Sequence, residues 1–177
     1  MKISYKKISI REFCEEDIKR KIIWINNPEN NMHLHYDLPL EEEKTKQWFV
    51  NKNNSDRCDC VIEYEGIPVG LIGLLSIDRT NLKAELYITI GEPSCKRKGI
   101  GTKSIGLILE YAFLILGLNK VYLMVDAENT NACKLYEKVG FRCEGTFEQD
   151  LLHRGKLIDR KRYAILKQEF QERLGAD

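Results

Sequence analysis

Two glycines and a run of basic residues lie between a strand-like segment and a helix-like segment. The sequence there is Lys96-Arg97-Lys98-Gly99-Ile100-Gly101-Thr102, after the β-patterned run 84–90 and before an apolar-periodic run that ends near Leu116. A helix N-terminus offers unpaired N–H groups and a partial positive charge, and glycine lets a ligand approach the backbone closely. The pattern therefore predicts a site that binds a diphosphate.

The spacing of the glycines distinguishes this loop from two other phosphate-binding loops. A P-loop requires Gly-x-x-x-x-Gly-Lys-Ser/Thr, and a dinucleotide fingerprint requires Gly-x-Gly-x-x-Gly, and neither fits. The pattern basic-x-x-Gly-x-Gly instead resembles the acetyl-CoA pyrophosphate loop of the GNAT N-acetyltransferase superfamily. That loop usually begins with Arg or Gln, and here it begins with Lys96. The resemblance implies a backbone cradle and leaves the side-chain contact of this lysine open.

A second segment strengthens the resemblance. Its sequence, Asn129-Thr130-Asn131-Ala132-Cys133-Lys134-Leu135-Tyr136-Glu137-Lys138-Val139-Gly140-Phe141, resembles the superfamily's Asn-x-x-Ala-x-x-Leu-Tyr-x-Lys-x-Gly-Phe. The resemblance implies that Tyr136 is the general acid and that Asn129 and Ala132 contact the pantetheine arm. A tyrosine with an ordinary pKa of about 10 is protonated at neutral pH, as an acid requires. Two alternatives stay open: Tyr136 packs beside Phe141 with its hydroxyl in water, and Asn129 is a helix N-cap.

The order of the predicted elements agrees with the same superfamily. Strands are expected at 3–11, 58–64, 67–77, 84–90, 121–125, 141–147 and 157–166, and helices at 15–26, 40–52, 100–116 and 130–139. The resemblance implies an α+β GNAT fold with a mixed, mostly antiparallel, seven-stranded twisted sheet flanked by four helices. The sheet should be splayed between its fourth and fifth strands, and residues 1–177 should form a single acetyltransferase domain.

The fourth predicted strand should supply much of the reaction site. In the superfamily the free edge of this strand pairs with the amide-bearing pantetheine arm of the cofactor. A backbone N–H on the strand stabilises the developing oxyanion, and the resemblance assigns this role to Ile88 or Ile90, with Thr89 beside them.

A general base is also required, because free amines are mostly protonated at pH 7. Glu85 lies on the same strand face as Tyr87 and Thr89 and is the predicted base. A solvated strand-end glutamate is the alternative interpretation. Asp126 and Glu128, near the end of the next strand, are further carboxylate candidates.

The segment between the first two predicted helices should bind the acceptor. Its candidate residues are His33, His35, Tyr36 and Asp37. This half of the chain resembles sugar-nucleotide amine acetyltransferases, whereas residues 119–145 resemble spermidine acetyltransferases. A protein N-terminus, as in ribosomal-protein acetyltransferases, is a third candidate. Acidic residues at 37, 41 and 42 suit a polycation, and the aromatic, histidine-containing loop suits a base or sugar ring. The two histidines lack a third ligand at useful spacing, so we predict no metal.

Composition sets the remaining limits. The 177 residues are 43% hydrophobic and 31% charged with a formal net charge of +1, typical of a soluble globular domain without nucleic acid or membrane partners. The N-terminal segment lacks the apolar run of a signal peptide, and the six cysteines are scattered, so we expect a cytoplasmic protein with reduced thiols. The strand 157–166 and the tail 167–177 could exchange between subunits, and we predict a homodimer.

These observations together predict an enzyme. It should move an acetyl group from acetyl-CoA to a primary amine, on a small molecule or a peptide N-terminus, by direct transfer through a tetrahedral intermediate. The alternative is a non-catalytic module that binds acyl-CoA as a sensor or regulator. The presence of Tyr136, Asn129 and both glycines favours catalysis.

Overall fold

The computed structural model describes residues 1–175. Its strands form one sheet in the order β1-β2-β3-β4-β5-β6-β8-β7. The strands are β1 Lys2–Tyr5, β2 Ile8–Glu12, β3 Cys58–Tyr64, β4 Ile67–Asp78, β5 Lys83–Ile90, β6 Lys120–Asp126, β7 Arg142–His153 and β8 Lys156–Leu166. The α-helices are α1 Ile18–Asn26, α2 Pro28–Asn31, α3 Glu42–Asn51, α4 Ile100–Glu110, α5 Thr130–Val139 and α6 Lys167–Leu174. The predicted α+β class with a mostly antiparallel sheet is confirmed.

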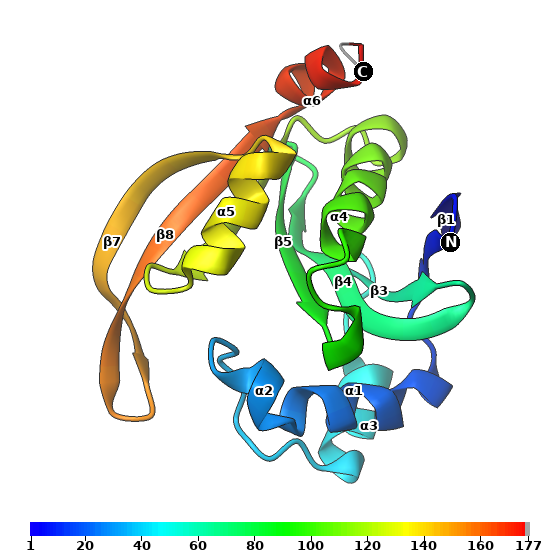
Figure 1. Cartoon of the computed structure of the whole chain (residues 1–177), viewed down its shortest axis with the longest axis vertical. Coiled ribbons are helices and arrows are strands. Elements are labelled where there is room, and N and C mark those ends of the chain that lie inside the picture. Colours follow the sequence, from blue (N-terminus) through cyan, green and yellow to red (C-terminus); the bar gives the residue numbers. More distant parts are fainter. Residues whose placement is uncertain (176–177) are drawn as a thin grey trace.

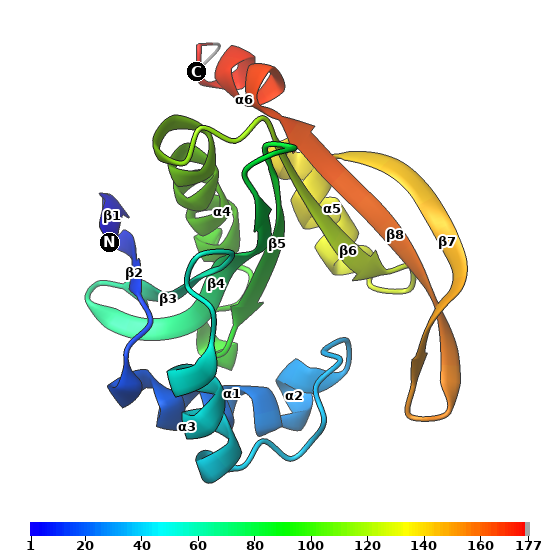
Figure 2. The ribbon, with the colours of Figure 1, turned by 180° about the vertical axis from the view of Figure 1, so that it is seen from behind.

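The sheet opens between β5 and β6, its one parallel pair among the described residues. These strands pair only from Lys83 to Glu85 and from Lys120 to Tyr122. Beyond that point β5 stays bound to β4 and β6 stays bound to β8, so the two halves of the sheet diverge. Figures 1 and 2 show the resulting wedge from opposite sides, with α1 and α2 beyond its open end. The predicted splay is confirmed, and it leaves residues 86–90 with a free backbone edge.

The element counts differ from the prediction. The single strand expected at 3–11 is a hairpin, because Lys6 adopts a positive φ of 54° and the chain reverses there. The sheet therefore has eight strands rather than seven. α2 was expected to be loop, but Asn27 caps it and Pro28 fits its first turn; α6 lies in the expected tail. None of the helices within residues 1–175 has the length and apolar character needed to cross a membrane.

Each face of the sheet has its own hydrophobic cluster. One cluster joins residues of α4 and α5 to Leu86 and Ile88 of β5. The other joins α1 and α3 to Leu71 of β4 and Tyr87 of β5. Because side chains alternate along a strand, Glu85 and Thr89 share the α1/α3 face with Tyr87. The wedge therefore opens onto both faces of the sheet, which we call the α4/α5 side and the α1/α3 side.

Candidate active site

The predicted diphosphate loop presents unpaired backbone donors at the start of α4. The N–H groups from Arg97 to Thr102 donate to no acceptor among residues 1–175, and Lys103 is the first to pair, with the carbonyl of Gly99. Gly99 has φ +76°, a left-handed conformation that disfavours other residues, and a Cβ placed there would contact nothing within 4 Å. The loop is therefore shaped by backbone conformation, and its donors remain free for a ligand.

Helices α1 and α2 hold this loop in place. Nε1 of Trp24 donates to Glu92 (2.7 Å), and Nδ2 of Asn30 donates to the carbonyl of Gly91 (2.8 Å). Nζ of Lys96 donates to the carbonyl of Glu29 (3.0 Å). The side-chain contact left open for Lys96 is thus an internal one, and the lysine anchors α2 to the loop. Arg97 and Lys98 remain exposed at the rim.

Tyr136 lies on the α4/α5 side with its ring packed and its hydroxyl unpaired. The side chain is 8% exposed, and its ring centroid lies 5.9 Å from that of Phe141 and 6.2 Å from that of Tyr163. Its hydroxyl donates to no acceptor within the described part of the chain. Burial raises the pKa of Tyr136 to about 12, so the phenol is protonated at neutral pH. The structure therefore has the packing of the Tyr136 ring against Phe141 that one interpretation of the sequence predicts. The hydroxyl proton is not used in a hydrogen bond to the described residues.

Asn129 caps α5, as one of the two sequence interpretations had it. Its Oδ1 accepts from the backbone N–H of Ala132 (3.2 Å). Its amide Nδ2 has no partner in the described structure. The same side chain can therefore cap the helix with its oxygen and donate to a ligand with its nitrogen.

Glu85 lies at the vertex of the wedge, on the α1/α3 side. It is the last β5 residue paired with β6, opposite Tyr122. Burial raises the pKa of its carboxyl group, and the nearby Arg160 and Arg162 oppose that shift. The carboxylate is therefore half-buried rather than a fully solvated strand end. Its raised pKa makes it a stronger base than an exposed glutamate, as a proton acceptor near neutral pH requires.

The predicted acceptor loop spans the open end of the wedge. Nδ1 of His33 lies 3.0 Å from Oδ2 of Asp126, and Nε2 of His35 lies 3.1 Å from Oδ1 of the same carboxylate. Asp126 is 5% exposed at the end of β6, so these contacts connect the loop to the half of the sheet that contains β6 and β8. The ring of His35 also meets that of His153 edge-on, with centroids 5.1 Å apart. Within residues 1–175 no cluster of histidine, cysteine and acidic side chains is arranged to hold a metal ion.

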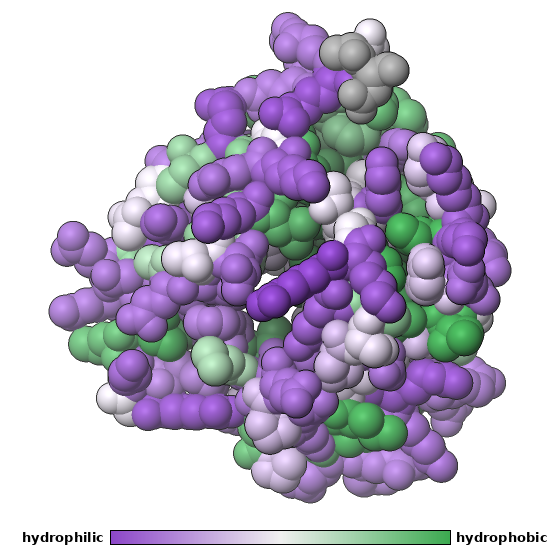
Figure 3. Space-filling view, viewed as in Figure 1, coloured by the Kyte–Doolittle hydropathy of each residue, from purple (hydrophilic) through white to green (hydrophobic). Residues whose placement is uncertain are grey.

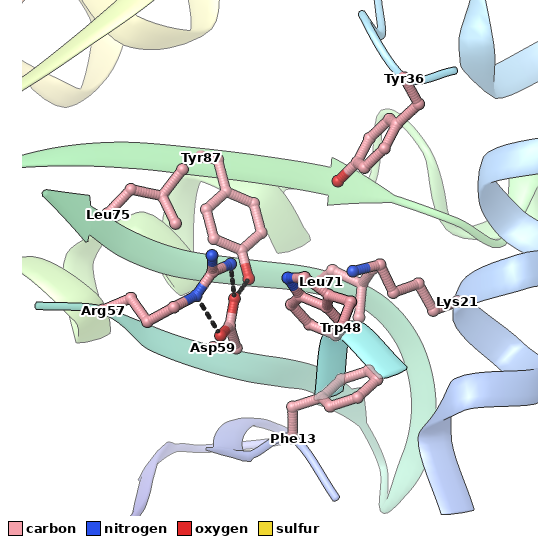
Figure 4. Close-up of a pocket in the computed structure, with 9 residues that line it drawn as sticks. All are labelled: Phe13, Lys21, Tyr36, Trp48, Arg57, Asp59, Leu71, Leu75 and Tyr87. Atoms are coloured by element: carbon pink, nitrogen blue, oxygen red, sulfur yellow. Dashed lines mark hydrogen bonds and ion pairs between the residues drawn. The ribbon is translucent and has the colours of Figure 1, made fainter. Parts of the chain in front are cut away.

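The other two predicted acceptor residues lie apart from this contact. Asp37 is exposed. Tyr36 lines a cavity of about 100 Å³ on the α1/α3 side, together with Lys21, Trp48 and Tyr87. Figure 4 shows the hydroxyl of Tyr36 directed into this space. The front of the molecule in Figure 3 is hollowed at its centre, with strongly hydrophilic side chains at the edge of the hollow.

Comparison with known proteins agrees with this geometry. Residues 7–142 match the acetyltransferase (GNAT) domain. The chain belongs to the GNAT acetyltransferase family. It is 33% identical over 152 residues to the spermidine N(1)-acetyltransferase of Vibrio cholerae, covering 84% of this chain and 87% of that one.

Solved structures of GNAT enzymes are also similar. The crystal structure of spermidine N-acetyltransferase from Vibrio cholerae in complex with CoA and spermine has a TM-score of 0.85 and 27% identity, covering 94% of this chain and 99% of that one. A dodecameric structure of that acetyltransferase in an intermediate state gives a TM-score of 0.81 and 27% identity, covering 96% and 99%.

The GNAT motifs do not point to the cavity residues, and sequence reasoning missed all three charged residues that line the cavity. They are Lys21, Arg57 and Asp59. A signal for the first was present: Lys21 interrupts the apolar stripe of α1 between Ile18 and Ile25, both of which are buried. A lysine on the buried face of a helix is unusual unless its charge is paired or serves a function such as ligand binding.

Proposed function

We propose that this protein is an N-acetyltransferase that moves the acetyl group of acetyl-CoA to a primary amine. The observation that carries the proposal is the run of unpaired amides from Arg97 to Thr102, beside the free edge of β5. These donors would bind the diphosphate of the cofactor, and Arg97 and Lys98 would add attraction at the rim. The CoA bound to the similar Vibrio cholerae enzyme supports the same cofactor here.

The pantetheine arm would lie in the wedge. The free backbone N–H and C=O groups of residues 86–90 would form hydrogen bonds with its amides, as they would with an additional β-strand. Asn129 would donate its free Nδ2, with Ala132 beside it. The N–H of Ile88 or Ile90, flanking Thr89, would stabilise the oxyanion that forms when the carbonyl is attacked.

The acid and the base would act from opposite sides of the wedge. Glu85 removes a proton from the ammonium group of the acceptor, directly or through water, and the neutral amine nitrogen then attacks the thioester carbon from the α1/α3 side and loses its second proton to solvent. When the tetrahedral intermediate collapses, the carbon–sulfur bond breaks and the thiolate takes the proton of Tyr136 on the α4/α5 side. The products are an N-acetylated amine and free CoA. The raised pKa of Glu85 supports its role as a base, and the raised pKa of Tyr136 keeps the phenol protonated at neutral pH.

Thiol release from acetyl-CoA tests this function. The amines offered should include polyamines, because spermine is bound in the similar structure, together with amino-sugar nucleotides and peptide N-termini. We expect release that depends on at least one amine. Tight acetyl-CoA binding by calorimetry with no amine-dependent release would instead support the non-catalytic acyl-CoA-binding module.

Two further expectations accompany the proposal. The β7–β8 hairpin exposes Leu152 and Leu157, and the similar dodecameric enzyme supports self-association, so we propose a dimer formed through this hairpin. Sedimentation of the wild type against a Leu152→Lys, Leu157→Lys variant would test it. The cysteines are all free, which suits the reducing cytoplasm.

A further inference from the structure

We infer that the cavity between α1, α3 and strands β3 to β5 binds an anionic group of the acceptor, a carboxylate or a phosphate. The inference rests on the proposed N-acetyl transfer and specifies its substrate class. The acceptor is an amine that carries an acidic group at some distance from its nitrogen, in contrast to a polyamine. The cavity is about 100 Å³, enough for such a group and a few waters.

Three donors point into this cavity without an acceptor. They are Nζ of Lys21, the hydroxyl of Tyr36 and the indole N–H of Trp48, none of which has an acceptor among residues 1–175. Lys21 is 8% exposed, so it is a buried ammonium group, and no carboxylate among residues 1–175 forms an ion pair with it. Figure 4 shows the three polar ends turned toward the space beside Tyr87. Convergent unpaired donors are what an anion requires, because it accepts from all of them.

The carboxylate of the cavity is already saturated. Arg57 donates to both oxygens of Asp59 (2.8 and 2.7 Å), and the hydroxyl of Tyr87 donates to Oδ1 (2.8 Å). Lys52 adds a contact of 3.3 Å from outside the cavity wall. Asp59 therefore has no oxygen left for Lys21.

The charge balance at the cavity is positive. Lys21, Arg57 and Lys52 carry three positive charges against the one negative charge of Asp59, which leaves two uncompensated. The pKa of Lys21 is lowered to about 8, mainly by burial; Asp59 opposes this shift, and Arg57 and Lys52 contribute to it. A bound anion would relieve this cost, whereas a second ammonium group would add to it.

Aromatic side chains wall the cavity. Nζ of Lys21 lies 3.3 Å from the ring centroid of Trp48 and 5.9 Å from those of Phe13 and Tyr36. The rings hold the ammonium group in place without quenching its hydrogen bonds. The same rings offer apolar contact to the part of the acceptor next to its acidic group.

The cavity adjoins the wedge along β5. Tyr87 lies two residues from Glu85 and two from Thr89 on the same strand face, and two residues of strand span about 7 Å. The loop that brings Tyr36 to the cavity also brings His35 to Asp126 at the end of β6. An acceptor with an acidic group at one end and an amine at the other can therefore contact the cavity and the wedge beside Glu85 at the same time.

Of the three acidic residues that could favour a polyamine, two are paired on the surface, and the third, Asp37, is exposed and does not line the cavity. Glu41 pairs with Lys44 and Glu42 pairs with Lys46, both pairs within the first turns of α3 (2.8 Å each). These are ordinary surface helix pairs. They leave no acidic counterpart in the cavity to which an ammonium group could bind.

The test compares acceptors that differ only in their far end. Wild-type enzyme is offered ω-amino acids and α,ω-diamines of matched chain length, with spermidine alongside. We expect kcat/KM to be at least about tenfold higher for the amino acids, as a charge-assisted contact predicts. Lys21→Met should raise the KM for amino acids about tenfold with little change in kcat. It should leave the KM for diamines and for acetyl-CoA unchanged.

A matched control and a binding measurement complete the test. Lys19→Met removes an exposed lysine from the same helix and should change none of these values. Inorganic phosphate should raise the melting temperature of the wild type, at constant ionic strength, more than that of Lys21→Met. Equal protection of both proteins would overturn the anion site.

Other outcomes overturn the assignment to the acceptor. Faster turnover of diamines than of amino acids by the wild type would do so. So would phosphate that protects the wild type but does not compete with the amino acid, because the cavity would then bind a separate effector. If no amine is acetylated while phosphate still protects only the wild type, the proposed function fails and the anion site survives.

Discussion

The two sides of the wedge are built from different materials. The α4/α5 side offers backbone groups: the amides from Arg97 to Thr102 and the free edge of β5. The α1/α3 side offers side chains brought from distant segments, such as Lys21 of α1 and Asp59 of β3. A backbone site depends on conformation and tolerates varied side chains, whereas a side-chain site changes with single substitutions. We therefore expect the cofactor side to be shared with similar enzymes and the acceptor side to be particular to this chain.

The largest effect is expected from a charge placed in the backbone site. Gly101→Glu puts a carboxylate among the free amides, and a Cβ there meets only ordinary contacts of 3.6 Å with Leu135 and 3.8 Å with Ile88. We predict that the Kd for acetyl-CoA rises about a hundredfold, or about 3 kcal/mol, measured by calorimetry. Gly106→Glu, in open space on the same helix, should bind normally. An unchanged Kd in folded Gly101→Glu would contradict the backbone site.

Removal of the proposed acid should affect kcat alone. Tyr136→Phe should lower kcat about a hundredfold or more, with the Kd for acetyl-CoA and the melting temperature unchanged, because the hydroxyl has no partner to lose. Wild-type activity should show no loss of this acid until the pH approaches about 12. Tyr163→Phe is the reverse control: its hydroxyl donates to Glu137 (2.7 Å), so stability should fall and kcat should not. Full turnover by Tyr136→Phe would remove the assignment.

The base on the opposite side should appear in the pH profile. Burial raises the pKa of Glu85, so activity should fall as the pH drops through a value above the ordinary 4.5. Glu85→Gln should lower kcat/KM roughly ten- to a hundredfold and abolish that acidic limb, measured from pH–rate profiles. Glu128→Gln, an exposed carboxylate beyond β6, should keep the limb. An acidic limb that persists in Glu85→Gln would point to another base.

The last prediction concerns the stability of the acceptor side rather than activity. Lys21 has a pKa of about 8 in the folded chain and 10.5 in the unfolded chain. Below pH 8 the lysine is charged in both states, so burial of its charge lowers the stability of the folded state by the full amount. This loss of stability decreases as the pH rises from 8 to 10.5. Lys21→Met should therefore be more stable at pH 7, by up to about 3 kcal/mol, and lose that advantage by pH 10.5. Urea unfolding at several pH values measures it, with Lys19→Met as control. A pH-independent difference would show that Lys21 has another counter-ion.

The sequence identified segments whose information is local. Two glycines within six residues mark the loop that begins at Lys96, and one helix motif contains Tyr136, while the roles of both in the reaction stay predictions. The opening of the sheet was implied by the resemblance to the GNAT superfamily, and the structure has it between β5 and β6. These features depend on backbone conformation, which short stretches of sequence determine.

Prediction failed where distant contacts decide. The turn at Lys6 lacks glycine, proline or asparagine, so the hairpin of β1 and β2 looked like one strand. The contact of His35 with Asp126 joins residues 91 apart in the chain. The same holds for Tyr87 and Asp59, whose hydrogen bond crosses β4 over Gly73, where a Cβ would lie 2.6 Å from the tyrosine ring. No local sequence pattern predicts such contacts between residues that are distant in the chain.

A crystal structure with bound CoA tests the central claim most directly. We predict that the diphosphate accepts from the amides between Arg97 and Thr102 and that the sulfur lies within reach of the Tyr136 hydroxyl. A diphosphate bound elsewhere, or a sulfur on the α1/α3 side away from that phenol, would contradict the account.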